Sequence, residues 1–191
     1  MEIAQFLENL PRGGLWVFGY GSLMWSPGFR ASGKSVALVR GYHRAMCILS
    51  HRYRGTPRKP GLVMGLCHGG SCWGMAFQVP ESRVRRVLAA LWRREMLNKV
   101  YKPKLIPATV APGRRIQALA FVADASHPQF VRELDLRARA RLVAQGIGQR
   151  GACVDYIRNT LEHMLALGLD DPHLSRVLDA AVNLSPGGRR R

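Results

Sequence analysis

The feature that most constrains the fold is a short apolar run, residues 16–25, which stops at closely spaced glycines: Trp-Val-Phe-Gly-Tyr-Gly-Ser-Leu-Met-Trp. Its first three residues favour a buried strand, and Gly19 and Gly21 then end that strand. Glycine permits positive φ and lets other groups approach the main chain closely. A strand feeding such a turn presents several backbone N–H groups together, which suits a carboxylate or a developing oxyanion. The run therefore predicts a strand followed by a substrate-binding loop.

Other interpretations of this loop can be tested by its spacing. A dinucleotide-binding fingerprint needs a third glycine where Met24 stands, and a phosphate-binding P-loop needs a lysine that does not follow. Ser22 lacks the Gly-x-Ser-x-Gly frame of a nucleophile elbow. A plain tight turn between two strands remains open as an alternative.

Length and composition indicate one globular domain. The chain has 191 residues, of which 47% are hydrophobic, and contains no apolar run long enough to cross a membrane. The first residues are acidic and do not have the pattern of a signal peptide. We expect a cytoplasmic protein with a single domain over residues 1–186 and a basic, disordered tail over residues 187–191.

Cysteine and histidine spacing argues against a metal site. There is no Cys-x-x-Cys pair and no pair of histidines four residues apart. In a reducing compartment such cysteines are most simply buried thiols, so we expect neither a metal nor a cofactor. The four cysteines are Cys47, Cys67, Cys72 and Cys153.

The net charge of +17 implies a positive field that attracts anions, whether nucleic acid, anionic lipid or a small acidic substrate. The arginines are spread along the chain, however, and aromatic residues are not interleaved with them. We therefore expect a dispersed basic surface, with no specific nucleic-acid or membrane partner. A non-catalytic module that binds anions or nucleic acid is the alternative that the charge leaves open.

Most of the first two thirds of the chain predicts β-structure. Alternating and continuous apolar runs, separated by Gly- and Pro-containing turns, indicate antiparallel strands. The strands are expected over Ser35–Ser50, as one long bent strand or two short ones, over Gly61–Cys67 and Cys72–Val79 as a hairpin closed by residues 68–71, and over Val100–Val110 and Arg115–Ala123 as a second pair.

A helix is predicted over Glu81–Met96, and Glu95 lies on its apolar stripe. Glu95 follows Leu88 by seven residues and Leu91 by four, so the helical period places it on the core-facing side. Burial and the negative end of the helix dipole are expected to raise the pKa of such a carboxylate, which suits a general base. The alternatives are a glutamate paired with an arginine and a helix that has frayed by this point.

The last third predicts helices over Phe130–Ala144 and Ala152–Leu167, then a helix that Asp171 caps and Pro172 begins. Antiparallel strands, an inserted helix and a helical C-terminal third indicate the α+β class, as a small mixed β-barrel with flanking helices. The mouth of such a barrel is a common ligand site.

Six short segments occur in an order that resembles the ChaC family of γ-glutamylcyclotransferases. The similarity covers residues 16–182 and implies a γ-glutamylcyclotransferase fold that cleaves glutathione to 5-oxoproline and cysteinylglycine. With glutathione as the implied small-molecule substrate, we expect a monomer without a cofactor. The segments are Tyr20-Gly21-Ser22-Leu23, Arg40-Gly41-Tyr42, Thr56-Pro57, Pro60-Gly61, Cys72-Trp73-Gly74 and Arg94-Glu95.

The resemblance also assigns site residues. The catalytic glutamate of the family falls on Glu95, and its C-terminal tyrosine falls on Tyr156. Where the family tends to have Gly-Ser-Asn, this chain has Gly-Ala-Cys at residues 151–153, so a turn or a substrate contact is altered there. Leu62 also stands where an arginine is frequent. The substrate-binding residues implied by the resemblance are Val17, Phe18, Gly19, Tyr20, Gly21, Ser22, Leu23 and Tyr156.

Overall fold

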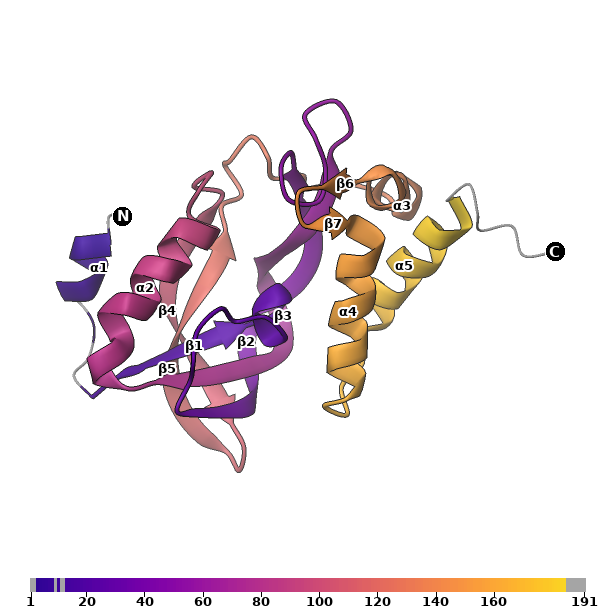
Figure 1. The fold of residues 1–191 in the computed structure, drawn as a ribbon. Coiled ribbons are helices and arrows are strands. Elements are labelled where there is room, and N and C mark those ends of the chain that lie inside the picture. Colours follow the sequence, from indigo (N-terminus) through magenta and orange to yellow (C-terminus); the bar gives the residue numbers. More distant parts are fainter. Residues whose placement is uncertain (1–2, 9, 11–12, 185–191) are drawn as a thin grey trace. The chain divides into compact units, whose positions relative to one another are not determined.

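The computed structural model describes residues 3–8, 10 and 13–184. Its strands form a closed barrel in the order β1-β3-β2-β4-β5 and a two-stranded sheet, β6-β7. The chain divides into two compact units, residues 1–44 with 66–124 and residues 45–65 with 125–191. The elements are α1 Ile3–Glu8, β1 Leu15–Gly19, the 3₁₀ helix η1 Ser22–Met24, β2 Gly33–Ser50, β3 Gly61–Val79, α2 Glu81–Glu95, β4 Tyr101–Val110, β5 Arg114–Ala123, α3 Leu136–Gln145, β6 Ile147–Gly148, β7 Gly151–Ala152, α4 Cys153–Leu165 and α5 Pro172–Leu184 (Figure 1).

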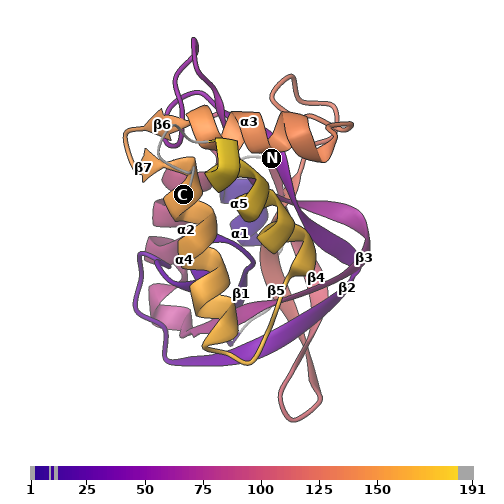
Figure 2. The same cartoon turned by 90° about the vertical axis from the view of Figure 1, so that its right-hand side faces the viewer.

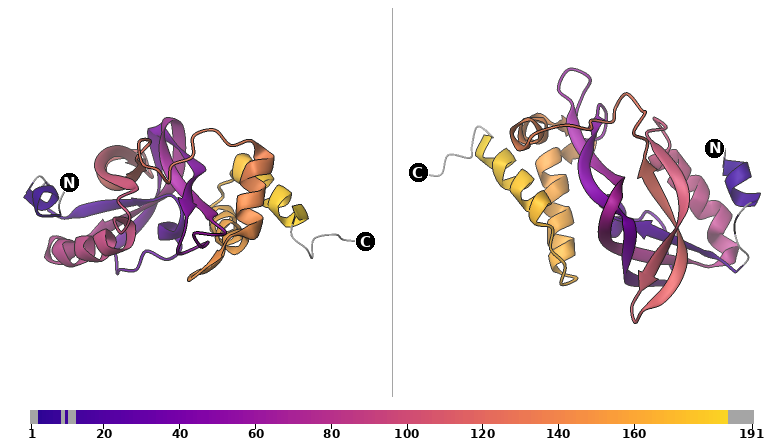
Figure 3. Two further views of the ribbon diagram at one scale, coloured as in Figure 1. Left: turned by 90° about the horizontal axis from the view of Figure 1, so that it is seen from above. Right: turned by 180° about the vertical axis from the view of Figure 1, so that it is seen from behind.

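In the first unit, β1 lies between two partners. It runs antiparallel to β3, with Gly19 opposite Met75, and parallel to β5, with Trp16 opposite Ala118. Strands β4 and β5 pair antiparallel along their whole length, as the right-hand view of Figure 3 shows. The predicted strand pair on either side of residues 111–113 is confirmed. The barrel is mixed, as predicted, because it contains both antiparallel and parallel strand pairs.

Helix α2 covers the barrel with the apolar stripe predicted from its sequence. The stripe residues are buried in one cluster with Val17 and Leu23 from the β1 region and Phe121 from β5. Helix α1 adds Phe6, whose ring lies 5.2 Å from that of Trp92 (centroid to centroid), and Figure 1 shows α1 beside α2. The stripe residues are Val84, Val87, Leu88 and Leu91.

The hairpin predicted at residues 68–71 is wrong. Strand β3 is continuous over 19 residues, and Gly69 and Gly70 lie inside it with φ of 96° and 70°. Two adjacent glycines in the left-handed region bend a strand as readily as they close a turn. Residues 33–50 likewise form one 18-residue strand, the first of the two arrangements expected there.

The second unit carries the C-terminal helices. Figure 2 shows α4 and α5 side by side in this unit. The helix predicted from Phe130 begins only at Leu136, because the backbone before it pairs with β2: Leu49 N donates to Gln129 O, and Val131 N donates to Cys47 O, both at 2.8 Å.

The predicted start of α5 is confirmed, since Leu174 N donates to Asp171 Oδ1 at 3.0 Å and Pro172 is the first helical residue. Helix α4 spans most of the predicted range. The predicted tail, residues 187–191, lies outside the described residues. Across the described ranges, no helix is long and apolar enough to cross a membrane.

Candidate active site

The loop that follows β1 is built on a close approach between two strands. A Cβ atom at Gly74 of β3 would lie 2.3 Å from Gly19 O and 2.7 Å from the Phe18 ring, so only glycine fits there. A Cβ at Gly19 would lie 2.9 Å from the Leu23 Cβ. These two glycines let the chain turn directly from the buried strand into the loop.

The loop continues as the 3₁₀ turn η1. Met24 N donates to Gly21 O, and Ser26 N donates to Ser22 O, both at 2.8 Å. The first amides of a helical turn have no acceptor inside it. The N–H groups at Gly21, Ser22 and Leu23 therefore precede the first internally bonded amide, which is the arrangement expected of an anion-binding loop.

Tyr20 is fixed at both its side chain and its backbone. Its hydroxyl donates to Phe121 O at 2.7 Å, and its carbonyl accepts a hydrogen bond from Arg44 Nε at 2.5 Å. Arg44 Nη2 also donates to Trp73 O at 2.7 Å. Hydrogen bonds thus link the start of the loop to β5 through the Tyr20 hydroxyl and to β3 through the Arg44 guanidinium.

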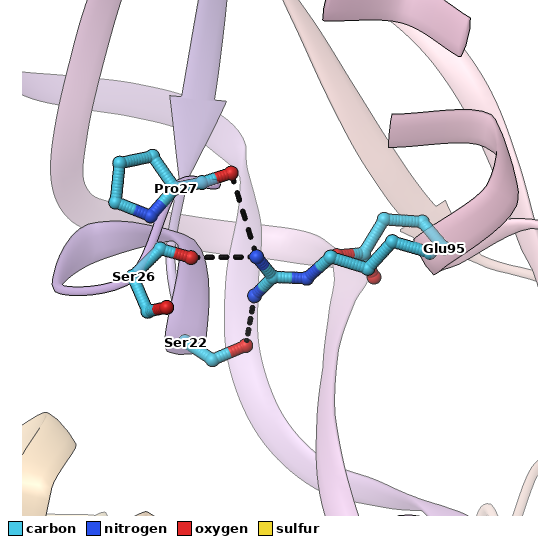
Figure 4. Close-up of polar contacts among 5 residues, drawn as sticks. Ser22, Ser26, Pro27 and Glu95 are labelled. Carbon is cyan, nitrogen blue, oxygen red and sulfur yellow. Dashed lines mark hydrogen bonds and ion pairs between the residues drawn. The ribbon is translucent and has the colours of Figure 1, made fainter. Parts of the chain in front are cut away.

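Glu95 is the last residue of α2, so the helix has not frayed before it. Its carboxylate Oε1 lies 2.9 Å from Arg94 Nε, and its side chain is 17% exposed. The guanidinium of Arg94 also donates from Nη2 to Ser22 Oγ at 2.8 Å. Figure 4 draws Glu95 together with the loop residues Ser22, Ser26 and Pro27. The structure therefore brings Glu95 and the predicted loop together, with Glu95 paired to an arginine.

The predicted loop residues differ in what their side chains do. Val17 and Phe18 are fully buried, and Leu23 packs in the cluster with α2, so these three contribute packing and backbone. Ser22 is half-buried and holds Arg94. Tyr156, the remaining predicted residue, lies in α4 of the second unit.

In the second unit, Tyr156 is buried beneath Arg54. The Arg54 guanidinium carbon lies 5.2 Å from the Tyr156 ring centroid, and Nη1 donates to Ala152 O at 3.1 Å. Burial lowers the pKa of Arg54. The neighbouring Cys153 donates from Sγ to Leu62 O at 2.6 Å, and burial raises its pKa to about 11. The expectation of a buried thiol holds for Cys153, Cys47 and Cys72, whereas Cys67 is partly exposed.

Glycines bring the backbone segments of this unit together around Arg54. A Cβ at Gly61 would lie 2.0 Å from Arg54 O, and one at Gly146 would lie 2.5 Å from the same oxygen. Gln149 N and Arg150 N donate to Arg52 O and Tyr53 O, each at 2.9 Å. The segment that contains Thr56-Pro57 and Pro60-Gly61 is therefore held by close packing of backbone against backbone.

Sequence reasoning did not identify Arg44 and Arg94 as parts of the site. In the sequence, Arg94 stands out only as the neighbour of Glu95, and Arg44 is one of many dispersed arginines. A charged side chain inside a strand, as at Arg44, and an arginine beside a stripe-facing carboxylate, as at Arg94, were the available signals. The described ranges contain no cluster of three or more His, Cys, Asp or Glu residues that could hold a metal ion.

Curated relatives of the chain are glutathione-specific gamma-glutamylcyclotransferases. The chain is 34% identical over 174 residues to the glutathione-specific gamma-glutamylcyclotransferase of Escherichia coli (strain K12), covering 90% of this chain and 74% of that protein. It is 33% identical over 178 residues to human glutathione-specific gamma-glutamylcyclotransferase 1, covering 90% and 80%.

A solved structure has the same fold. The crystal structure of a yeast gamma-glutamyl cyclotransferase specific to glutathione superposes with a TM-score of 0.85 at 17% identity, covering 94% of this chain and all of that one. The sequence model of the ChaC family, described as ChaC-like protein, matches residues 15–184. The chain therefore belongs to the ChaC family.

Proposed function

We propose that this protein cleaves the γ-glutamyl bond of glutathione by intramolecular cyclisation, releasing 5-oxoproline and cysteinylglycine. The observation that carries the proposal is the junction of the loop and Glu95, where one guanidinium contacts both the Ser22 hydroxyl and the Glu95 carboxylate. The names of the Escherichia coli and human relatives support glutathione as the substrate.

The reaction needs one base that later acts as an acid. The α-amine of the γ-glutamyl group must lose a proton, attack its own γ-carbonyl and close a five-membered ring. The leaving amide nitrogen then needs a proton. A single carboxylate can accept the first proton and deliver the second, and Glu95 is our candidate for both roles. Because the nucleophile belongs to the substrate, this chemistry requires no nucleophilic side chain from the protein.

The loop would bind and orient the substrate. Amides at Gly21, Ser22 and Leu23 are suited to the α-carboxylate or to the oxyanion of the tetrahedral intermediate. Val17, Phe18, Gly19 and Tyr20 hold this loop in place from the barrel side. We assign Tyr156 to substrate binding only by its resemblance to the family pattern.

The setting of the reaction is part of the same proposal. A net charge of +17 creates a field that draws in anionic glutathione. We propose a cytoplasmic monomer whose single catalytic domain spans residues 1–186. Light scattering coupled to size exclusion tests the monomer, since a mass near 21.3 kDa is expected and a mass near twice that value contradicts it.

The first test incubates the purified protein with glutathione and follows both products by mass spectrometry. Glu95→Gln keeps the size of the side chain but removes the base, so turnover is expected to fall about 1,000-fold, within the range for general acid–base groups. Circular dichroism of the variant serves as the control for folding. Turnover near that of the wild type in Glu95→Gln would remove Glu95 from the mechanism.

A second candidate substrate class is other γ-glutamyl peptides or amines. It is favoured by the change to Ala152 and Cys153 where the family tends to have serine and asparagine. Turnover of glutathione and γ-glutamyl-alanine, measured side by side, separates the two. A higher kcat/KM for γ-glutamyl-alanine would replace glutathione as the preferred substrate.

A further inference from the structure

We propose that Arg94 is a positioning residue for the reaction, which holds the segment from Ser22 to Pro27 in place against Glu95. The kinetic consequences of this role rest on the proposed function, whereas its hold on the loop does not. Arg94 acts through these neighbours, since its guanidinium contacts the loop and the carboxylate in the structure.

The guanidinium binds the loop at more than one point. Nη2 donates to Ser22 Oγ at 2.8 Å, and Nη1 donates to Ser26 O at 2.5 Å, with Pro27 O at 3.4 Å from the same nitrogen. Dashed lines in Figure 4 mark the hydrogen bonds to Ser22, Ser26 and Pro27. Arg94 therefore contacts the loop as a fork rather than through a single atom.

The contacts fall at the two ends of one turn. Ser26 N donates to Ser22 O at 2.8 Å, which closes the turn that contains η1. Arg94 binds the side chain at the beginning of this turn and the carbonyl at its end. A shift of the turn along the barrel would break both hydrogen bonds together, so the guanidinium fixes its position.

The contact between Arg94 and Glu95 depends on the hydrogen bonds that the loop accepts from the guanidinium. Adjacent residues on a helix point about 100° apart and do not face each other, so helix geometry alone does not pair Arg94 with Glu95. The pair nonetheless forms at 2.9 Å, with both side chains less than 20% exposed. The loop acceptors hold the guanidinium where its Nε can bind the carboxylate, and the carboxylate is oriented in return.

This arrangement sets the distance between the substrate-binding amides and the base. Catalysis requires the reacting groups to be aligned closely, and a displacement of about 1 Å can lower the rate by about 100-fold. Without the guanidinium, the loop and the carboxylate lose their shared partner. We therefore expect the main loss in kcat and a smaller change in KM.

The kinetic test compares Arg94→Ala with Arg93→Ala. Arg93 precedes Arg94 in the last turn of α2 and is exposed, so this control removes the same charge without the loop contacts. With glutathione, we expect kcat to fall about 100-fold in Arg94→Ala with KM changed less than about threefold, and near wild-type values in Arg93→Ala. A kcat for Arg94→Ala within about threefold of the control would overturn the inference.

Two further measurements separate positioning from simple support of the fold. Added guanidinium ion should restore part of the kcat of Arg94→Ala but none in Glu95→Gln. Arg94→Lys keeps the charge without the fork and should remain well below the wild type. A fully active lysine variant would contradict the need for a fork, and absence of guanidinium rescue together with a lowered Tm would assign Arg94 a structural role only.

Hydrogen exchange distinguishes failure of this inference from failure of the proposed function. It needs no substrate, so it remains decisive if the folded wild type does not turn over glutathione. The amides of Met24 and Ser26, which are hydrogen-bonded within the turn, should exchange about ten times faster in Arg94→Ala than in Arg93→Ala, because an anchored turn opens less often. Equal exchange in the two variants would overturn the hold of Arg94 on the loop.

Discussion

Each of the two units brings distant segments together around one arginine, half-buried in the case of Arg94 and buried in the case of Arg54, but the two arginines are used differently. In the first unit, hereafter the barrel unit, Arg94 binds a hydroxyl, backbone carbonyls and the Glu95 carboxylate. In the second unit, hereafter the helical unit, Arg54 binds one carbonyl and stacks on Tyr156, and it forms no ion pair among the described residues. The first arginine links groups that take part in the proposed chemistry, whereas the second is surrounded by packed backbone.

A shifted pKa does not by itself mark an active site. Arg54 and Cys153, whose pKa values are shifted, both lie in the helical unit, and burial is the largest cause of each shift. Desolvation alone moves a pKa without implying catalysis. Glu95 is instead identified by its position at the loop and by its partner.

The largest expected effect is on the free energy of unfolding, at glycines where two backbone segments pack closely. Gly61→Ala should lower the free energy of unfolding by about 3 kcal/mol, at the upper end for overpacking, because the new Cβ would meet Arg54 O at 2.0 Å. Gly74→Ala should cost about as much in the barrel unit, and should also disturb the loop through Gly19. Urea unfolding measures both losses.

Gly33→Ala is the matched control, since the nearest atom to its Cβ, at 3.3 Å, is the end of the flexible Gln78 side chain. It should change the free energy of unfolding by less than about 1 kcal/mol. If Gly61→Ala were as stable as this control, the tight backbone packing around Arg54 would be refuted.

An intermediate effect is expected at Arg54 itself. Arg54→Ala should lower the free energy of unfolding by about 2 kcal/mol, since it removes a desolvated cation–π contact and a hydrogen bond to Ala152 O. Arg93→Ala removes an exposed arginine and should be nearly neutral. Equal stability of the two variants would mean that the Arg54 stack contributes nothing.

The smallest effect is a pH dependence from Cys153. The folded protein holds this thiol protonated, with its pKa raised to about 11 from the ordinary value of 9.0. The unfolded chain therefore ionises first, and the stability contribution, complete below pH 9, is lost as the pH rises toward 11. Between pH 9 and pH 10 the wild type should lose about 1 kcal/mol more than Cys153→Ala.

Urea unfolding of both proteins at each pH measures this difference, and subtraction removes the titration of all other groups. Parallel pH profiles would show that Cys153 is not a buried, neutral thiol. Slow reaction with a thiol reagent at pH 8 in the folded state is the corresponding kinetic expectation.

Local signals in the sequence predicted the parts of the fold that depend on local physics. The period of the α2 stripe, the strand pair β4–β5 and the Asp171 cap depend on neighbours in the chain and were predicted correctly. The hairpin at Gly69–Gly70 failed, because glycines mark a turn and a strand bend alike. Residues 130–135 were predicted as helix, but backbone pairing of Gln129 and Val131 with β2 overrides the local preference.

The candidate site, too, was predictable only where its residues are marked by local sequence. Gly19, Gly21 and Glu95 stood out from turn chemistry and helix phase, and the resemblance supported them. The role of Arg94 could not be read from the sequence, because its acceptors lie about 70 residues away along the chain. A partnership of that kind depends on how the barrel places the loop beside the end of α2.

The most direct test of the central claim is the fate of the γ-carbonyl when glutathione is turned over in ¹⁸O-labelled water. Cyclisation predicts unlabelled 5-oxoproline and cysteinylglycine in equal amounts, because the substrate's own amine attacks the carbonyl. Hydrolysis would instead give glutamate carrying ¹⁸O. Labelled glutamate as the main product would contradict the account of a substrate-borne nucleophile.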